Sequence, residues 1–147
     1  SDDFIGVAEQ QGAKLAEATS VSSPVNVPTH RGFVFRGKNI DEVQEIYKVG
    51  AKTDIQISSF STDSAIGHDF ARIGRISESN TSVVLNIEPG AKGLNISPIS
   101  SYIGEKERIF HGRFEVISIE KTVDIDTNSP FLNILIRQIN NFVKEAK

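Results

Sequence analysis

The sequence predicts an α+β domain built on mostly antiparallel sheets, and three observations predict it. Short apolar or alternating runs, typical of strands, fill the middle of the chain. Helical spacing of apolar residues occurs near both ends, in residues 2–18 and from residue 130 onward. The chain has 147 residues, 38% of them hydrophobic, so one domain with a packed core is expected over residues 1–147. Strands in the middle with helices at both ends favour helices that flank an antiparallel sheet.

The N-terminal elements come first. Residues 2–18 predict a helix and residues 19–29, rich in Ser, Val and Pro, a connector, ahead of a core in residues 30–147. Residues 32–37 predict a short buried strand that ends in a turn. Asn39 is expected to cap the next helix in a capping box with Glu42, and Gly50 to end it. Three residues would form its inner face: Val43, Ile46 and Tyr47.

The remaining runs complete the predicted sheets. Residues 55–62 and 82–88 predict strands, residues 64–70 one or two helical turns, and residues 94–99 a short strand or an irregular crossing. Residues 107–110 and 113–125 predict two strands around a turn at His111-Gly112. From Pro130 a helix is expected, because seven apolar residues recur at helical spacing: Phe131, Leu132, Leu135, Ile136, Ile139, Phe142 and Val143.

The composition excludes several classes of function. A net charge of -3 argues against a general nucleic-acid binder. No apolar run approaches the roughly 20 residues that a membrane-spanning helix needs, so no membrane span is expected. Without Cys there is no disulfide, thiolate nucleophile or Cys-based zinc site. The chain also has no Met, and we expect it to be a processed or excised domain of a longer protein.

Glu105 and Glu107 are the first candidate site residues. In an extended chain, residues i and i+2 point to the same face, so both carboxylates enter the same space. Like charges held close cost free energy, which suits a catalytic site or a position where water screens the charges. Taken alone, a solvated strand edge, with Lys106 and Arg108 on the other face, is the simpler interpretation.

Two other patterns carry little weight. The sequence from Gly32 to Lys38 approximates a phosphate-binding P-loop, but Asn39 stands where Ser or Thr would hold magnesium, and the interior is strand-like. The three histidines have no metal-ligand spacing, so no metal site is expected and surface positions are the better interpretation: His30, His68 and His111.

Polar side chains that could form part of a binding site lie at the ends of two predicted strands. Arg36 closes an apolar strand, where a guanidinium can bind a phosphate or carboxylate, although an edge arginine in water is an equal alternative. The serine-rich end of the next predicted strand, residues 58–63, supplies hydroxyls that can orient a carboxylate. Taken alone, that stretch is better explained as an ordinary strand-to-helix turn with Asp63 as a helix cap.

In order along the chain, these motifs resemble the mono-ADP-ribosyltransferases of the Arg-Ser-Glu class, similar to arginine-specific bacterial toxins. The resemblance covers residues 32–120 and rests on three motifs, Phe35-Arg36-Gly37, Phe60-Ser61-Thr62 and Glu105-Lys106-Glu107. The chain departs from the family's middle motif, because Ser59 replaces an aromatic residue and Asp63 replaces the last Ser or Thr.

The resemblance implies NAD as substrate, no metal, and a split pair of β-sheets with flanking helices around an NAD cleft. It assigns the stabilisation of an oxocarbenium-like transition state to Glu107, which Ser61 would hold in place. Arg36 would bind the NAD phosphates, and the Gly37 backbone the nicotinamide amide. Four further residues would contribute to NAD binding: Thr62, Phe70, Arg72 and Arg75.

The resemblance also implies the acceptor. Glu105 would orient and help to deprotonate the guanidinium of a target-protein arginine, and Tyr102 would contact that protein. The expected protein is a monomeric toxin or effector, secreted or delivered into a target cell, with NAD and a target protein as partners and no nucleic acid. An NAD glycohydrolase using the same site, or a non-catalytic ADP-ribosyltransferase-like binding module, remain as alternatives.

Overall fold

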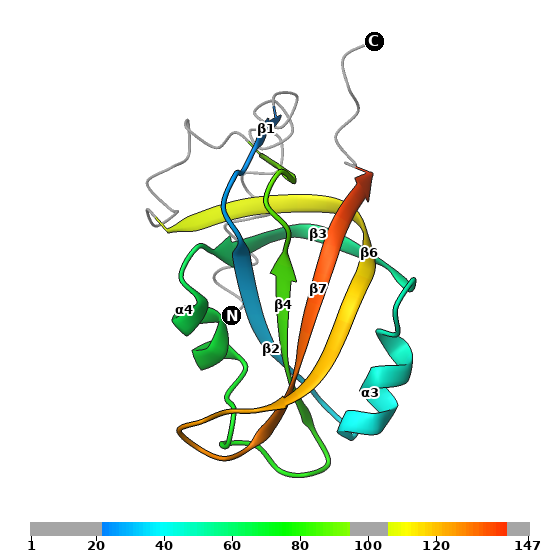
Figure 1. The fold of residues 1–147 in the computed structure, drawn as a ribbon, viewed down its shortest axis with the longest axis vertical. Helices are drawn as coiled ribbons and strands as arrows, with labels where there is room; N and C mark the ends of the chain where they lie inside the picture. Colours follow the sequence, from blue (N-terminus) through cyan, green and yellow to red (C-terminus); the bar gives the residue numbers. More distant parts are fainter. Residues whose placement is uncertain (1–21, 95–105, 141–147) are drawn as a thin grey trace.

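The computed structural model of this chain describes residues 22–94 and 106–140. Five strands close into a barrel in the order β2-β3-β6-β7-β4, and β1 and β5 form a separate two-stranded sheet (Figure 1). All pairs are antiparallel except the parallel pair β4–β7. The predicted fold class with two mostly antiparallel sheets is confirmed. The elements are β1 (Ser22–Pro24), β2 (Thr29–Phe35), α3 (Ile40–Ile46), β3 (Lys52–Ser61), α4 (Ser64–Phe70), β4 (Thr81–Ile87), β5 (Lys92–Leu94), β6 (Glu107–Val123) and β7 (Pro130–Asn140).

Helix α3 begins as its sequence predicts. The Asn39 side chain accepts a hydrogen bond from the Glu42 backbone N–H, and the Glu42 side chain accepts one from the Asn39 N–H, both at 3.0 Å. Val43 is fully buried, as expected, but Ile46 is 43% exposed, because the helix already ends there. Tyr47 caps the end of the helix and packs edge-on against Phe35.

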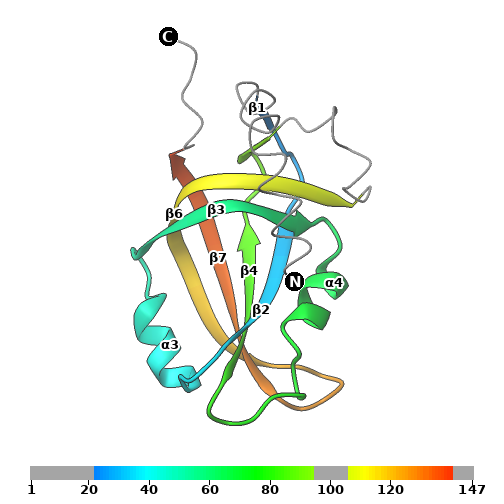
Figure 2. The same cartoon turned by 180° about the vertical axis from the view of Figure 1, so that it is seen from behind.

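Strand β6 corrects the prediction of two strands around a turn at His111-Gly112. Its first half pairs with β3 and its second half with β7, so one continuous strand of 17 residues passes from one neighbour to the other. Gly112 has a φ of 145°, a conformation that side chains disfavour, and the register with β7 shifts just beyond it. The signal taken for a turn is a bend in a strand, which Figures 1 and 2 show as the sweep of β6 across the barrel.

The predicted C-terminal helix is also wrong, because residues from Pro130 form strand β7. Leu132, Ile134 and Ile136 are fully buried at alternate positions, which is the period of a strand. Phe131 is buried on the opposite face, under α4, and this second apolar face produced the apparent helical spacing. Pairing with β4 on one side and β6 on the other fixes the strand.

Near the N-terminus the chain forms a strand where only a connector was expected. Ser22–Pro24 pairs with Lys92–Leu94, which lies at the start of the predicted short strand or crossing. The predicted helix of residues 2–18 lies outside the described residues, as do residues 95–99. Strands β2, β3 and β4 and helix α4 lie within a few residues of their predicted positions.

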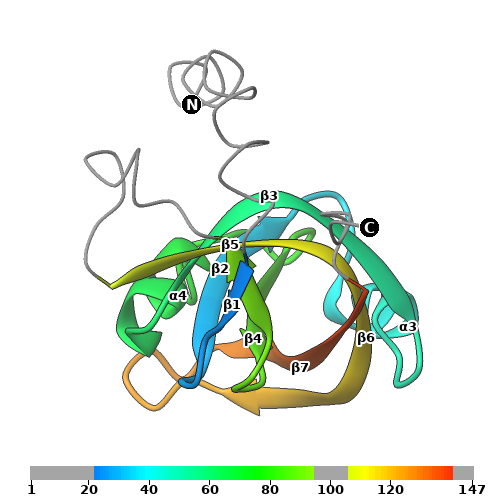
Figure 3. The same ribbon diagram turned by 90° about the horizontal axis from the view of Figure 1, so that it is seen from above.

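The barrel strands enclose one main apolar core, and α4 covers a smaller one (Figure 3). Helix α4 lies directly on β2, because Gly32 has no side chain there. A Cβ atom at this position would overlap the carbonyl oxygen of Gly67 and lie 2.6 Å from the Ala71 nitrogen. This contact places α4 beside the adjacent ends of β2 and β3. In the part of the chain that the structure describes, no helix is long and apolar enough to cross a membrane.

Candidate functional site

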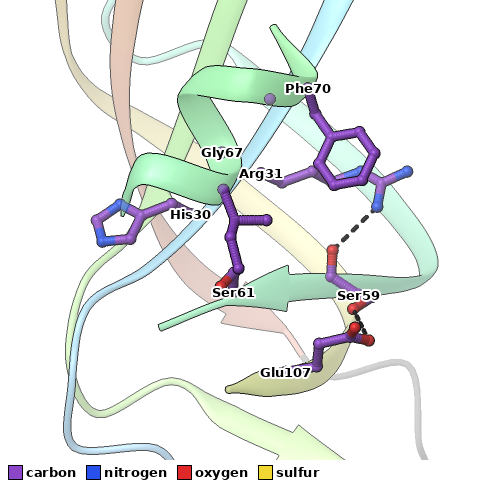
Figure 4. A pocket seen from close by; sticks show the side chains of 9 residues that line it. His30, Arg31, Ser59, Ser61, Gly67, Phe70 and Glu107 are labelled. Carbon is purple, nitrogen blue, oxygen red and sulfur yellow. Dashed lines mark hydrogen bonds between the residues drawn. The ribbon is translucent and has the colours of Figure 1, made fainter. Parts of the chain in front are cut away.

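A pocket of about 350 Å³ lies where α4, the start of β2, the end of β3 and the start of β6 meet (Figure 4). Polar and charged side chains share its wall with the apolar side of α4. The lining residues are His30, Arg31, Gly32, Ser59, Ser61, Ile66, Gly67, Phe70 and Glu107.

Strand β3 presents two serines to this pocket by simple alternation. Phe60, between them, points into the core, where it is almost fully buried and packs edge-on against Phe110 with ring centres 5.6 Å apart. Since neighbouring side chains in a strand point to opposite faces, burial of Phe60 turns Ser59 and Ser61 towards the pocket.

Glu107 enters from the first residue of β6, directly opposite Ser61 in the ladder. A backbone hydrogen bond of 2.7 Å from Thr62 to the Lys106 carbonyl extends that pairing past the end of β3. The predicted proximity of Ser61 and Glu107 is therefore present. The hydrogen bond predicted between them is not: the Ser59 hydroxyl donates to Glu107 Oε2 at 2.8 Å, whereas Ser61 Oγ accepts from the Asp63 N–H at 3.0 Å.

The arginine of the pocket is Arg31. Its Nη1 donates to the main-chain carbonyl of Ser59 at 2.9 Å, and Figure 4 shows Arg31 and Glu107 reaching Ser59 from opposite sides. The side chain keeps contact with solvent, yet the pocket walls lower the pKa of Arg31 through desolvation. Among the described residues no carboxylate lies within ion-pair distance of Arg31. Its remaining N–H groups are suited to an anionic ligand.

Arg36 and Gly37, the predicted phosphate and nicotinamide contacts, lie at the other end of β2. Arg31 pairs with Leu85 and Phe35 with Thr81, so Phe35 lies about 13 Å further along the strand. Gly37 donates its backbone N–H to Asn80 rather than into the pocket. The chain contains two Arg-Gly steps, Arg31-Gly32 and Arg36-Gly37, and only the first lines the pocket. The Arg31-Gly32 step is distinguished by its glycine, because Gly32 lies beneath α4, where a side chain would not fit.

The other predicted site residues divide into three groups. Phe70 lines the pocket and is 66% exposed at its mouth, whereas Thr62 is not among the lining residues. Arg72 and Arg75 follow α4 outside the pocket, and Arg75 forms an ion pair of 3.0 Å with Asp69. Glu105 and Tyr102 lie outside the described residues.

The contacts of Asp63 give a physical reason for an Asp at the position where the family motif has Ser or Thr. Its side chain caps α4 by accepting from the Ala65 N–H at 3.0 Å, and it contacts Lys106 Nζ at 3.4 Å. The Ala65 N–H, and secondarily Lys106, lower the pKa of Asp63. Asp63 therefore connects the start of α4 to the residue before Glu107.

A row of polar side chains crosses β2, β4 and β7 behind the pocket, and no sequence motif predicts it. Asn86 Oδ1 lies 2.6 Å from His30 Nδ1, while the Asn86 amide donates to Asn133 Oδ1 at 2.7 Å and to the Ile134 carbonyl. Because that amide uses its N–H groups on β7, its oxygen faces His30 Nδ1. This arrangement fixes the imidazole at the pocket wall.

Metal ligands are not clustered in residues 22–94 and 106–140, where no three His, Asp or Glu side chains are placed to hold a metal ion. The three histidines lie on different elements. Burial lowers the pKa of His111, on β6.

Comparison with known proteins identifies the fold. No protein-family model and no curated protein matches the sequence. Among solved structures, the Vis toxin, an ADP-ribosyltransferase from Vibrio splendidus, matches with a TM-score of 0.59, 16% identity and 95% of this chain covered. Vis in complex with agmatine matches with a TM-score of 0.60 and 17% identity over 91% of this chain. The enzymatic component C2-I of the C2 toxin from Clostridium botulinum gives 0.54 and 18% identity over 95% of this chain.

The chain spans 62% of the Vis chain and 37% of the C2-I chain. Sequence identities below 25% show the fold alone. Within this fold, the pocket brings together a carboxylate, an arginine and two serines. The chain resembles bacterial ADP-ribosyltransferase toxins and has their fold.

Proposed function

We propose that this domain cleaves NAD at the nicotinamide–ribose bond and transfers ADP-ribose to an arginine side chain of a target protein. The observation that carries the proposal is the pocket itself, within an ADP-ribosyltransferase fold. In it Glu107 and Arg31, which has no carboxylate partner in residues 22–94 and 106–140, both contact Ser59.

The chemistry of bond cleavage suits this pair of charges. Nicotinamide in NAD carries a positive charge before it leaves, so departure needs no proton donor. Positive charge then develops on the ribose, and the Glu107 carboxylate stabilises it. The open N–H groups of Arg31 bind the NAD diphosphate as a planar fork. The exposed ring of Phe70 offers an aromatic face to the nicotinamide at the mouth of the pocket.

The acceptor assignment rests on the sequence and on one related structure. Glu105 would orient an incoming guanidinium, and Vis has been solved with agmatine, a small molecule that ends in a guanidinium group. Hydrolysis to free ADP-ribose uses the same Glu107 with water in place of the guanidinium. By analogy with the toxins of this fold, we propose that the protein is secreted or delivered into another cell.

The test measures nicotinamide release from NAD, with and without agmatine, and transfer of label from NAD to agmatine. The wild-type domain should release nicotinamide and label agmatine. Glu107→Gln, which keeps the size of the side chain but removes its charge, should lower both activities by about a hundredfold or more. Glu105→Ala should lower transfer and leave hydrolysis. Absence of nicotinamide release and of NAD binding by the wild-type domain would favour a non-catalytic binding module.

A matched pair of variants separates the two candidate arginines. Arg31→Lys keeps the charge but loses the fork, and should raise KM for NAD about tenfold. Arg36→Lys makes the same chemical change at the other end of β2 and should leave KM within about twofold. The reverse result would return the phosphate contact to Arg36.

A further inference from the structure

Ser59 makes two hydrogen bonds that are chemically independent. Its hydroxyl donates to Glu107 Oε2 at 2.8 Å, and its main-chain carbonyl accepts from Arg31 Nη1 at 2.9 Å. The first bond depends on the side chain and the second does not. One residue of β3 thus contacts both charged groups of the pocket, one through each part of its structure (Figure 4).

We propose that Ser59, and not Ser61, is the positioning residue of Glu107, and that its backbone also sets the position of Arg31. The inference rests on the proposed function. A carboxylate rotates freely about its last bonds unless a donor holds it, and the Ser59 hydroxyl fixes one oxygen. The other oxygen then faces the pocket, where the ribose would lie.

Ser61 is occupied with a different task. Its Oγ accepts from the Asp63 N–H and so shapes the turn between β3 and α4. Ser59 is two residues earlier on the same face of β3, and burial of Phe60 holds that face towards Glu107. The replacement of the family's aromatic residue by Ser59 therefore adds the donor on which the carboxylate relies.

The division between side chain and backbone gives a sharp kinetic test. Ser59→Ala removes the hydroxyl but keeps the carbonyl that holds Arg31. We expect kcat for nicotinamide release to fall about tenfold to a hundredfold, the range for a hydrogen bond to a charged group. The dissociation constant for NAD, measured by calorimetry, should stay within about threefold. Ser59→Thr, which restores the hydroxyl, should recover most of kcat.

Two further serine variants locate the effect. Ser58→Ala, on the same strand, removes a hydroxyl that donates only to the nearby Gln56 carbonyl and should leave kcat unchanged. Ser61→Ala should lower kcat less than Ser59→Ala does. If Ser61→Ala gives the larger loss, or if Ser59→Ala weakens NAD binding with kcat intact, the proposal is overturned.

A coupling measurement keeps the test separate from the proposed activity. The free energies of unfolding of Ser59→Ala, Glu107→Ala and the double variant are compared by urea titration. If the hydroxyl holds the carboxylate, the second substitution costs less once the first is present, whether or not the protein turns over NAD. Strict additivity of the two changes would refute the Ser59–Glu107 contact, while coupling without nicotinamide release would refute the enzymatic function alone.

Discussion

Replacing Gly32 with alanine tests whether the close approach of α4 to β2 builds the pocket. The added Cβ would lie 2.6 Å from the Ala71 nitrogen and 2.8 Å from the Gly67 carbonyl carbon, and it would overlap the Gly67 oxygen. Ordinary van der Waals contact begins at 3.4 Å, so α4 must withdraw by at least 0.8 Å to relieve the Ala71 contact alone. The contacts are with backbone atoms, which have no rotamer that would make room.

A helix moved by that distance loses its packing on the sheet. Overpacking by one methyl costs about 1–3 kcal/mol, and a gap of this size forfeits a quarter to a half of each dispersion contact in the cluster of Ala71, Ile73, Val84 and Phe131. We expect Gly32→Ala to lower the free energy of unfolding by about 3 kcal/mol, which corresponds to about 10 °C in melting temperature.

The matched control is Gly50→Ala. Gly50 has a φ of 89° and no atom within 4 Å of its missing Cβ, so the same substitution there costs only the backbone strain of about 1–2 kcal/mol. Urea titration gives both stabilities, and calorimetry with NAD reports on the pocket. Gly32→Ala should lose NAD binding under conditions where the protein stays folded, and Gly50→Ala should keep it. Equal costs at the two positions would refute the packing argument.

Three other expectations follow from named contacts. Phe60→Ala should lower the free energy of unfolding by about 3–5 kcal/mol, because it leaves a cavity where a buried ring packs in the core. Urea titration measures this free energy, and a loss below about 1 kcal/mol would contradict the burial of Phe60. Asn86→Ala should cost about 1–3 kcal/mol in the same assay, since it leaves His30 Nδ1 and the Asn133 side chain without their partner. Asp63→Asn should lower the melting temperature at neutral pH, because the pKa of Asp63 is lower in the folded state than its unfolded pKa of 3.8. The Asp63 carboxylate therefore stabilises the fold above the unfolded pKa, and this stabilisation is lost as the pH falls through the folded-state pKa. A difference between Asp63→Asn and wild type that persists unchanged at low pH would exclude this electrostatic origin.

The predictions of secondary structure that were confirmed depend on residues close together in the sequence. The capping box at Asn39 and Glu42, the helical turns of α4 and the strands before and after them depend on neighbouring residues, and those signals are complete in the sequence. Ser61 and Glu107, which the family motifs name, lie opposite each other in the β3–β6 ladder.

The errors arose where distant parts of the chain decide the structure. Strand β7 places Leu132, Ile134 and Ile136 in the barrel core and Phe131 in the second cluster beside α4. Apolar residues on both faces of the strand obscure its alternating period in the sequence. The placement of Arg31 rather than Arg36 in the pocket depends on where α4 packs, because Gly32 and not Gly37 lies beneath that helix. The Ser59 hydroxyl reaches Glu107 diagonally across the β3–β6 ladder, and short sequence motifs do not predict such a contact.

The hairpin between β6 and β7 has a practical use, because none of its residues lines the pocket (Figure 1). Asp124 holds this turn through Thr127, and the adjacent Ile125 is 96% exposed. The chain contains no cysteine. A single Cys placed at position 125 would therefore be the sole thiol of this chain. A fluorophore or surface linker could be attached there without replacing a residue that lines the pocket.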